Sequence, residues 1–323
     1  MYKKIIKLFS ISVTATVIII SLLIGCAPAA PATSVSQYPV HAAKTRFKIA
    51  TTTSLYDTGL WYYLEPMFEK YADVEMDIIY AGTGIALEYG KRGDVDAVVV
   101  HDPAAEDKFI ADGYGINRRY FAYNFFLIAG PATDPAGIKG LSATEAFKKI
   151  YEAGMSSPDS VKFISRGDNS GTHSKEKLIW SKAGFNYDDI LNSGKWYEEA
   201  GKGMGPSLVM ANEQQAYILA DISTFLSYTK NINDKATIVS LVEQDPVFLN
   251  VYAVMAINPD TTKVQNIDIA NKFINWLISP EIQNVIGTYG KAEYGRPLFF
   301  PLSDDSCTME GCPSSDKYSI PVP

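Results

Sequence analysis

The sequence predicts an α/β protein made of two doubly wound units, each a mostly parallel sheet with helices on both faces. Three observations support this prediction. Strand-like and helix-like patterns alternate along the chain. The segment Ala97-Val98-Val99-Val100 is apolar throughout, which is typical of a strand buried on both faces. Three polar segments each follow a predicted strand and precede a predicted helix.

The first unit begins near Arg46, and residues 47–50 have the pattern of a short strand. Apolar residues at helical spacing across 60–71 predict the helix that follows. Alternating apolar and polar residues at 74–80 predict a second strand, and residues 85–89 predict a short helix after it. With the apolar strand that comes next, this order predicts a doubly wound sheet.

The second unit follows the strand predicted at residues 123–130. Ser142 to Glu145 is a capping box, with Ser at the cap and Glu three residues later, and it opens a helix. A strand at 161–164 and a helix at 175–182 come next, and a further strand is predicted at 237–242. We found no internal repeat.

Two strands, at 125–129 and 251–257, are expected to carry the chain between the two units. Helices near 267–278 and 281–289 then complete the first unit. We therefore expect a discontinuous first domain of residues 46–129 and 253–301, a second domain of residues 130–252, and a C-terminal tail of residues 302–323.

The N-terminal residues 1–25 have the pattern of a lipoprotein signal peptide. Three lysines precede an almost wholly apolar run, and the run ends in Leu23-Ile24-Gly25-Cys26, which resembles a bacterial lipobox. Cleavage would leave Cys26 as the lipid attachment site and residues 26–45 as a flexible tether. The alternative is an uncleaved membrane anchor. Both interpretations place the globular part outside the cytoplasmic membrane.

The chain of 323 residues carries a net charge of −7, which becomes −10 if Lys3, Lys4 and Lys7 are removed with the signal peptide. Such a chain repels nucleic acid, and there is no run of Lys and Arg elsewhere. It would also repel an anion at long range. An anion site in this protein must therefore be built locally, from hydrogen-bond donors and one cation.

Two further cysteines, Cys307 and Cys312, lie near the C-terminus. Outside the cytoplasm this spacing favours a small disulfide loop. The alternative is a metal site, which needs about four ligands, and no other Cys or nearby His is available. We expect no direct cation ligands and no cofactor in this protein.

The three polar segments are Thr51–Ser54, Ala81–Gly84 and Ser165–His173. Ligands of open α/β sheets bind at the carboxyl ends of the strands, where the first turn of a helix offers unpaired N–H groups. Ser and Thr add hydroxyl donors, and Gly allows close approach. Each segment alone is more often an ordinary helix cap. If the three converge, they would bind an anion.

The third segment is the most specific, because it places Arg166 among short polar residues. Its guanidinium could bind two oxygens of an anion, or it could pair with Asp168. His173 is expected to support this turn, because no motif of a serine hydrolase is present. We expect a structural hydrogen bond for His101. Trp196-Tyr197 and residues 201–205 have the pattern of a loop over a cleft.

These motifs resemble those of the tungstate-binding proteins of ABC transporters, the TupA type. The resemblance covers residues 46–301 in order, and the tail lies outside it. The segments that carry it are Thr51–Ser54, Ala81–Leu87, Val100–Pro103, Gly113–Arg119, Ser165–His173, Gly201–Gly205, Ala211–Glu213 and Arg296–Phe300.

The resemblance implies a type II periplasmic-binding-protein fold, with two α/β domains joined by two crossover strands and the ligand in the cleft. It implies an extracytoplasmic, lipid-anchored monomer that captures tungstate and delivers it to an ABC permease. It also implies that the oxyanion is bound by Thr53, Ser54, Arg166, Ser170, Gly171 and Thr172. We add Thr83 from its position at the second strand-to-helix junction. Asn169 stands where the motif often has Asp.

A fully ionised oxyanion only accepts hydrogen bonds, so its site should present donors. Asp168 is a nearby acceptor that keeps a protonated phosphate open as an alternative, and sulfate is smaller. Molybdate is nearly the same size as tungstate and stays open too. The competing class is a secreted hydrolase using Ser170 and His173, and a remote third is an adhesion protein, since residues 166–168 spell Arg-Gly-Asp. We expect no catalytic residue.

Overall fold

The computed structural model describes residues 43–232, 235–243, 245–303 and 307–323. The expected signal peptide, the lipid attachment at Cys26 and all of the 26–45 tether but its last three residues lie outside this part of the chain. Contacts group Lys44–Pro323 into one unit. In the described residues, no helix has both the length and the apolar character needed to span a bilayer.

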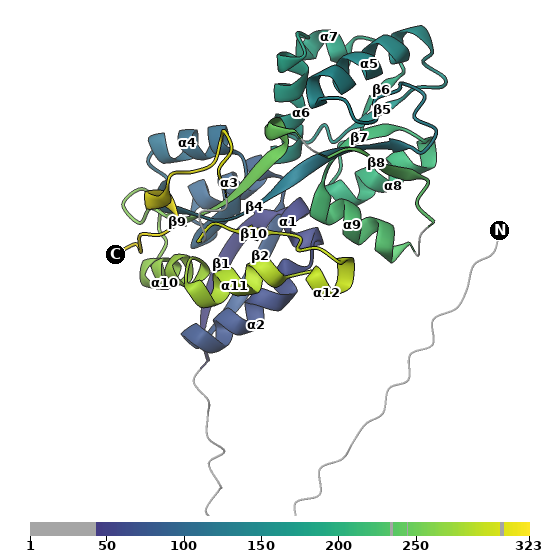
Figure 1. Ribbon diagram of the computed structural model, residues 1–323. Helices are drawn as coiled ribbons and strands as arrows, with labels where there is room; N and C mark the ends of the chain where they lie inside the picture. Colours follow the sequence, from purple (N-terminus) through teal and green to yellow (C-terminus); the bar gives the residue numbers. More distant parts are fainter. Residues whose placement is uncertain (1–42, 233–234, 244, 304–306) are drawn as a thin grey trace, which may run out of the picture. The chain divides into compact units, whose positions relative to one another are not determined.

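The strands of the described residues form one mixed sheet in the order β2-β1-β3-β9-β4-β7-β5-β6, with β8 and β10 paired to β4 (Figure 1). Their bounds are β1 Thr45–Thr52, β2 Val74–Ala81, β3 Ala97–Val100, β4 Gly115–Pro131, β5 Phe163–Ser165, β6 Tyr197–Glu199, β7 Tyr217–Asp221, β8 Ile238–Val242, β9 Leu249–Ile257 and β10 Phe300–Pro301.

Helices cover both faces of this sheet (Figure 1). Their bounds are α1 Thr53–Asp57, α2 Leu60–Ala72, α3 Thr83–Arg92, α4 Pro103–Ala111, α5 Ala143–Ser156, α6 Gly171–Lys182, α7 Tyr187–Leu191, α8 Met204–Gln214, α9 Ile222–Asn231, α10 Ile267–Leu277, α11 Pro280–Thr288 and α12 Lys291–Tyr294, with short 3-10 turns η1 Pro246–Phe248 and η2 Ser315–Lys317.

We call β1, β2, β3, β9 and the part of β4 that pairs with β9 the first half of the sheet. The strands β1, β2 and β3 are parallel. Ile49 and Val99 pack on one face with α2 and α10, whereas Ala50 and Val98 pack on the other with α3 and α4. This alternation buries the strands on both sides and confirms the doubly wound arrangement that the apolar strand predicted.

The second half of the sheet contains β5, β6, β7, β8 and the rest of β4, and it is built in the same way. Phe163 and Tyr217 pack against α5 and α6 on one face. Their neighbours Ile164 and Ile218 pack against α8 and α9 on the other. Each half therefore has its own pair of hydrophobic cores, as expected for a compact α/β unit.

The long strand β4 connects the two halves. Its residues up to Phe125 pair with β9, whereas Phe126 and the residues after it pair with β7 and β8. The strand β9 lies wholly in the first half, antiparallel to both β3 and β4. The strand predicted at 251–257 therefore does not itself cross between the halves, and the chain returns to the first half through the segment that contains η1.

The sequence patterns missed several elements. The helix predicted at 175–182 begins four residues earlier, at Gly171, because Ser170 caps it. The helices α4, α8 and α9 were not predicted, since their apolar residues show little helical periodicity or follow a strand directly. Trp196 and Tyr197 do not form a loop over a cleft. They belong to the core of the second half, beside Trp180.

The C-terminal tail lies against β4 and β9. Leu302 and Tyr318 pack on β4 and β9, close to the cysteine loop. Cys307 and Cys312 are joined by a disulfide bond. Farther on, Asn275 and Val322 exchange hydrogen bonds of 2.9 Å and 2.7 Å, which fix the end of the chain to α10.

Candidate functional site

The first polar junction joins β1 to α1. The Thr52 hydroxyl oxygen accepts a 3.3 Å hydrogen bond from the Leu55 N–H and so caps the short helix. Ser54 is fully buried. Its hydroxyl group lies 3.0 Å from Nε2 of His101, the residue that follows β3. The buried side chain of His101 therefore contacts and supports this junction.

The second junction joins β2 to α3 and faces the second half of the sheet. Gly82 caps α3 without a side chain. A Cβ atom on Gly82 would lie 3.4 Å from the Asp168 carbonyl oxygen. The buried hydroxyl of Thr83 accepts a 3.1 Å hydrogen bond from the N–H of Gly171. The first turns of α3 and α6 therefore meet directly.

The third junction joins β5 to α6 through a tight turn. Gly167 and Asn169 adopt positive φ angles of 58° and 55°. One Asp168 carboxylate oxygen accepts a 3.2 Å hydrogen bond from the Ser170 N–H. The Ser170 hydroxyl in turn accepts from the backbone N–H of His173 at 3.3 Å and caps α6. The turn is thus folded on itself by its own polar side chains.

Arg166 lies where these junctions come together, and only 1% of it is exposed. Its Nη2 donates to Thr53 Oγ1 at 3.1 Å and to the Asp168 carboxylate. Its Nε donates to the Lys202 carbonyl at 3.4 Å. Its Nη1 is buried and has no hydrogen-bond partner among the described residues, and the same is true of the Thr172 hydroxyl. Both groups are donors that a ligand can satisfy.

The electrostatics of this region favour an anion. Burial lowers the pKa of the Arg166 guanidinium, and the Asp168 carboxylate opposes that effect. The guanidinium therefore stays charged in a buried place. The first turns of α3 and α6 add the positive ends of two helix dipoles. An anion that reached Nη1 would meet the charge of Arg166 and these two helix ends, with the Asp168, Asp57 and Asp221 carboxylates as the opposing charges.

A second layer of side chains holds the third junction in place. The buried carboxylate of Glu176 accepts from Ser165 Oγ at 2.7 Å, Trp180 Nε1 at 3.1 Å and Tyr197 OH at 2.7 Å. Burial raises the pKa of Glu176 to about 7. Ser165 Oγ accepts from the Gly167 N–H at 3.2 Å. The turn is therefore fixed to the core beneath it.

His173 supports the same turn, as expected. Its Nδ1 accepts a 3.0 Å hydrogen bond from the Asn169 N–H, and its Nε2 lies 2.6 Å from the Tyr187 hydroxyl. Burial lowers its pKa to about 4, which keeps the imidazole neutral. The Ser170 hydroxyl hydrogen-bonds to the backbone N–H of His173 and not to its imidazole ring. The pair therefore lacks the serine-to-imidazole hydrogen bond that a hydrolase requires.

The structure adds contacts that sequence reasoning missed. The Thr224 hydroxyl, on α9, donates to the Ser54 carbonyl at 3.1 Å. A Cβ atom on Gly203, which caps α8, would lie 3.6 Å from the Thr53 side chain. Asp57 accepts a hydrogen bond from the Gly205 backbone. Nothing in the local pattern of Thr224 or Asp57 marks them, since both contacts join segments more than 100 residues apart.

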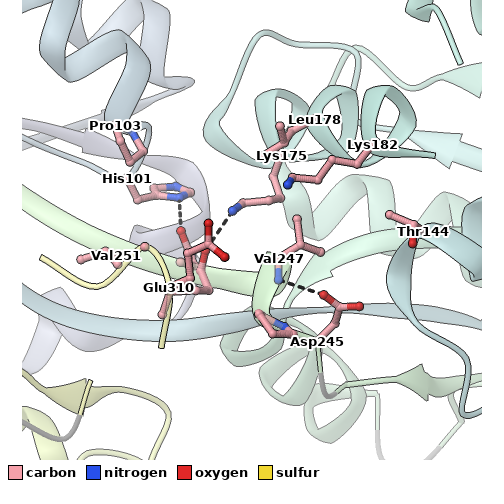
Figure 2. A pocket seen from close by; sticks show the side chains of 14 residues that line it. His101, Pro103, Thr144, Lys175, Leu178, Lys182, Asp245, Val247, Val251 and Glu310 are labelled. Carbon is pink, nitrogen blue, oxygen red and sulfur yellow. Dashed lines mark hydrogen bonds between the residues drawn. The ribbon is translucent and has the colours of Figure 1, made fainter. Parts of the chain in front are cut away.

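A cavity of about 460 Å³ lies next to the site. None of the predicted ligand residues lines it, but His101, which contacts the Ser54 hydroxyl, does. Lys175 and Lys182 project toward it from α6, and Glu310 reaches it from the tail (Figure 2). Charges of both signs line this cavity, whereas Arg166 Nη1 and Thr172 Oγ1, two of the five buried side-chain atoms without a hydrogen-bond partner in the described residues, belong to the third junction. Among the described residues, no group of three His, Cys, Asp or Glu could hold a metal ion.

The match to a family model gives the general class of this protein. A family model described as a PBP superfamily domain matches residues 28–281. This match, with the two-part sheet, makes the chain a periplasmic-binding-protein-type solute-binding protein, and the predicted fold class is confirmed. At the level of the family, such proteins bind solutes for transporters and are not enzymes.

The individual relatives are more specific. The chain is 40% identical over 298 residues to the tungstate-binding protein TupA of Peptoclostridium acidaminophilum, covering 91% of this chain and 98% of that protein. It matches the TupA structure from Desulfovibrio alaskensis G20 at 37% identity, 80% and 98% coverage and a TM-score of 0.66. It matches the structure of the tungstate ABC transporter from Geobacter sulfurreducens at 43% identity, 77% and 100% coverage and a TM-score of 0.67.

The chain therefore belongs to the TupA-type family of tungstate-binding proteins. The resemblance stated from the sequence motifs is confirmed.

Replacing Gly167 by Ala tests how tightly the third junction is built. The new Cβ would lie 2.5 Å from Glu199 Cβ and would require a positive φ. We expect the free energy of unfolding to fall by about 2–4 kcal/mol. Gly201 has a similar φ but open space around it. Gly201→Ala should cost only about 1–2 kcal/mol. Urea denaturation measures both, and equal losses would show that the close approach to Glu199 is unimportant.

Proposed function

We propose that the protein captures tungstate between the two halves of its sheet and delivers it to an ABC permease. The observation that carries this proposal is that Arg166 Nη1, before α6, and Thr172 Oγ1, in its first turn, are buried and have no hydrogen-bond partner among the described residues. Tungstate is a tetrahedral dianion that accepts hydrogen bonds in every direction. A site of converging donors suits it, and the relatives that cover most of the chain are tungstate-binding proteins.

The proposed ligands are the residues predicted from the sequence. Arg166 and the Ser170–Thr172 turn would hold the oxygens on the side of the second half. The Thr53–Ser54 turn and the first turn of α3 at Thr83 would hold those on the side of the first half. The ligand would bridge both halves, so that binding favours the state in which they are close.

The donor set favours a fully ionised oxyanion over a protonated phosphate. A protonated oxygen needs an acceptor, and Asp168 was the nearby candidate. Both of its oxygens are already engaged, one by Arg166 Nη2 and the other by the Ser170 N–H. Each of these oxygens has a further lone pair that could accept from a protonated phosphate. The preference for a fully ionised oxyanion therefore rests on Arg166 Nη1, a donor without a hydrogen-bond partner among the described residues, and phosphate is the competing ligand that the titration below tests.

The motion that we propose is an opening of two domains about β4 and the η1 segment that leads into β9. The predicted boundaries near 129 and 252 would move to where the strand pairing changes, which gives residues 46–125 with 249–301 as one domain and residues 126–248 as the other. The change of partners along β4 between Phe125 and Phe126 supports a boundary in this strand. The contacts between Arg166 and Thr53 and between Gly171 and Thr83 would break on opening and let the anion enter.

We further propose that the protein works as a monomer outside the cytoplasmic membrane. The lipobox-like sequence before Cys26 supports a lipid anchor, and residues 26–45 would let the folded part reach the permease. In this arrangement the anion is captured close to the membrane that it has to cross.

A calorimetric titration of the folded part with tungstate, sulfate and phosphate tests the proposed function. Tungstate should bind more tightly than either of the others. Arg166→Ala should weaken tungstate binding at least about 30-fold, because a buried charged donor is lost. Arg166→Lys keeps the positive charge and should bind tungstate with intermediate affinity. It is the second variant to test in case Arg166→Ala does not fold.

The control variant is Arg92→Ala, which removes the same charge from an exposed ion pair with Asp94 and should leave binding unchanged. If tungstate binds no better than sulfate, the assignment is wrong. If Arg166→Ala and Arg166→Lys both bind normally, the site lies elsewhere.

Gly171→Ala tests whether the two halves must come close around the ligand. The added Cβ would lie 2.9 Å from Cε1 and 3.0 Å from Nδ1 of His101, which belongs to the first half. We expect tungstate affinity to fall about 10- to 100-fold. Gly205 also faces the first half, but its Cβ would make an ordinary contact of 3.7 Å with Asp57. Gly205→Ala should therefore bind normally, and a comparable loss in both variants would refute the explanation.

A further inference from the structure

The Ser54 hydroxyl, which also lies 3.3 Å from the Thr52 hydroxyl, belongs to a buried chain of hydrogen bonds. Its oxygen lies 3.0 Å from His101 Nε2. His101 Nδ1 lies 2.8 Å from Asn250 Oδ1, on β9. Asn250 Nδ2 lies 3.1 Å from the Asp221 carboxylate, at the start of α9. The chain thus links the first junction to a carboxylate in the centre of the molecule.

Asp221 fixes the direction of this chain. Its Oδ2 accepts from Asn124 Nδ2 at 2.8 Å, from Tyr252 OH at 2.8 Å and from Asn250. A carboxylate cannot donate, so the amide NH₂ of Asn250 must face it. The Asn250 carbonyl then faces His101, and the proton between them must belong to His101 Nδ1.

This arrangement decides the role of Ser54. Burial lowers the pKa of His101, which keeps the imidazole neutral and leaves Nε2 without a proton. The Ser54 hydroxyl then donates its only proton to Nε2, the nearer of its two partners, and its oxygen can accept from the Thr52 hydroxyl 3.3 Å away. Seen from the site, Ser54 Oγ offers lone pairs, and so does every oxygen of a fully ionised anion. The hydroxyl cannot bind tungstate in this state.

We propose that tungstate binding through the Ser54 hydroxyl is accompanied by uptake of one proton on His101 Nε2. The new N–H bond donates to Ser54 Oγ, and the Ser54 O–H turns to an oxygen of the anion. The proton comes from the solvent, and no bond in the anion is broken. This inference rests on the proposed function and adds that capture of the dianion is linked to a proton.

The surroundings of His101 make this step feasible. The ring lines the 460 Å³ cavity, through which water can approach it (Figure 2). Asp221 and Asp102 favour the charged imidazole, whereas Arg166 opposes it. A bound dianion would offset the effect of Arg166. The titratable side chains on the elements and the cavity wall around His101 are Asp57, Asp102, Arg166, Lys175, Lys182, Asp221, Asp245, Tyr252 and Glu310.

Lys175 is the alternative source of a linked proton. It lines the same cavity, and burial lowers its pKa to about 8. Its ammonium group donates to the Leu249 carbonyl at 3.0 Å, away from the junctions that make up the site. An experiment must therefore distinguish proton uptake on His101 from proton uptake on Lys175.

Calorimetric titration of tungstate at pH 7 in buffers of different ionisation enthalpy counts the protons taken up. The observed heat should vary with buffer enthalpy with a slope of about one proton per tungstate, and affinity should fall about tenfold per pH unit above pH 7. His101→Asn should abolish the slope, and Lys175→Met should keep it. Nitrogen-15 NMR of the wild-type imidazole should show both ring nitrogens protonated only with tungstate bound.

The outcomes separate the two claims. Tungstate binding with no dependence on the buffer would overturn the proton uptake and leave the proposed function intact. A slope that survives in His101→Asn, or vanishes in Lys175→Met, would overturn the assignment to His101. No tungstate binding in any buffer would overturn the proposed function itself.

Discussion

The guanidinium of Arg166 lies buried where the two halves of the sheet meet, and its charge has to be compensated inside the protein. Removing such a charge from water costs several kcal/mol unless it is paired and hydrogen-bonded. Asp168, Thr53 and the Lys202 carbonyl satisfy part of it, and Nη1 has no hydrogen-bond partner in the described part of the chain. The remaining hydrogen-bonding capacity of this buried cation is what a bound anion would complete.

The surrounding structure holds the Arg166 guanidinium at a fixed place. Glu176 and His173 fix the turn from below, each through hydrogen bonds to short-range partners. Gly171 allows the first half of the sheet to approach the turn, because a Cβ atom there would lie 2.9 Å from Cε1 of His101. Binding energy can then go into closing the two halves and need not order a flexible loop. The overall negative charge of the chain does not prevent this, because the site is positive only locally.

Much of this could be predicted from the sequence. The three strand-to-helix junctions were visible as short polar segments after apolar ones, and they do converge. The partners that lie far away in the chain were not visible. Nothing near Thr224 or Asp57 indicates a contact with the opposite half, and Trp196 looked like a loop residue because its aromatic partners come from other helices. Nor could the sequence show which way the Ser54 hydroxyl points, which depends on Asp221, 167 residues later.

The most direct test of the central claim is to locate the metal atom itself. A crystal of the protein grown with tungstate, measured at a tungsten absorption edge, would give one strong anomalous peak. The account predicts that this peak lies within hydrogen-bonding reach, through its oxygens, of Arg166 Nη1 and the Thr172 hydroxyl, between the first turns of α3 and α6. A peak in the cavity beside Lys175 and Lys182, with the three junctions unoccupied, would contradict it.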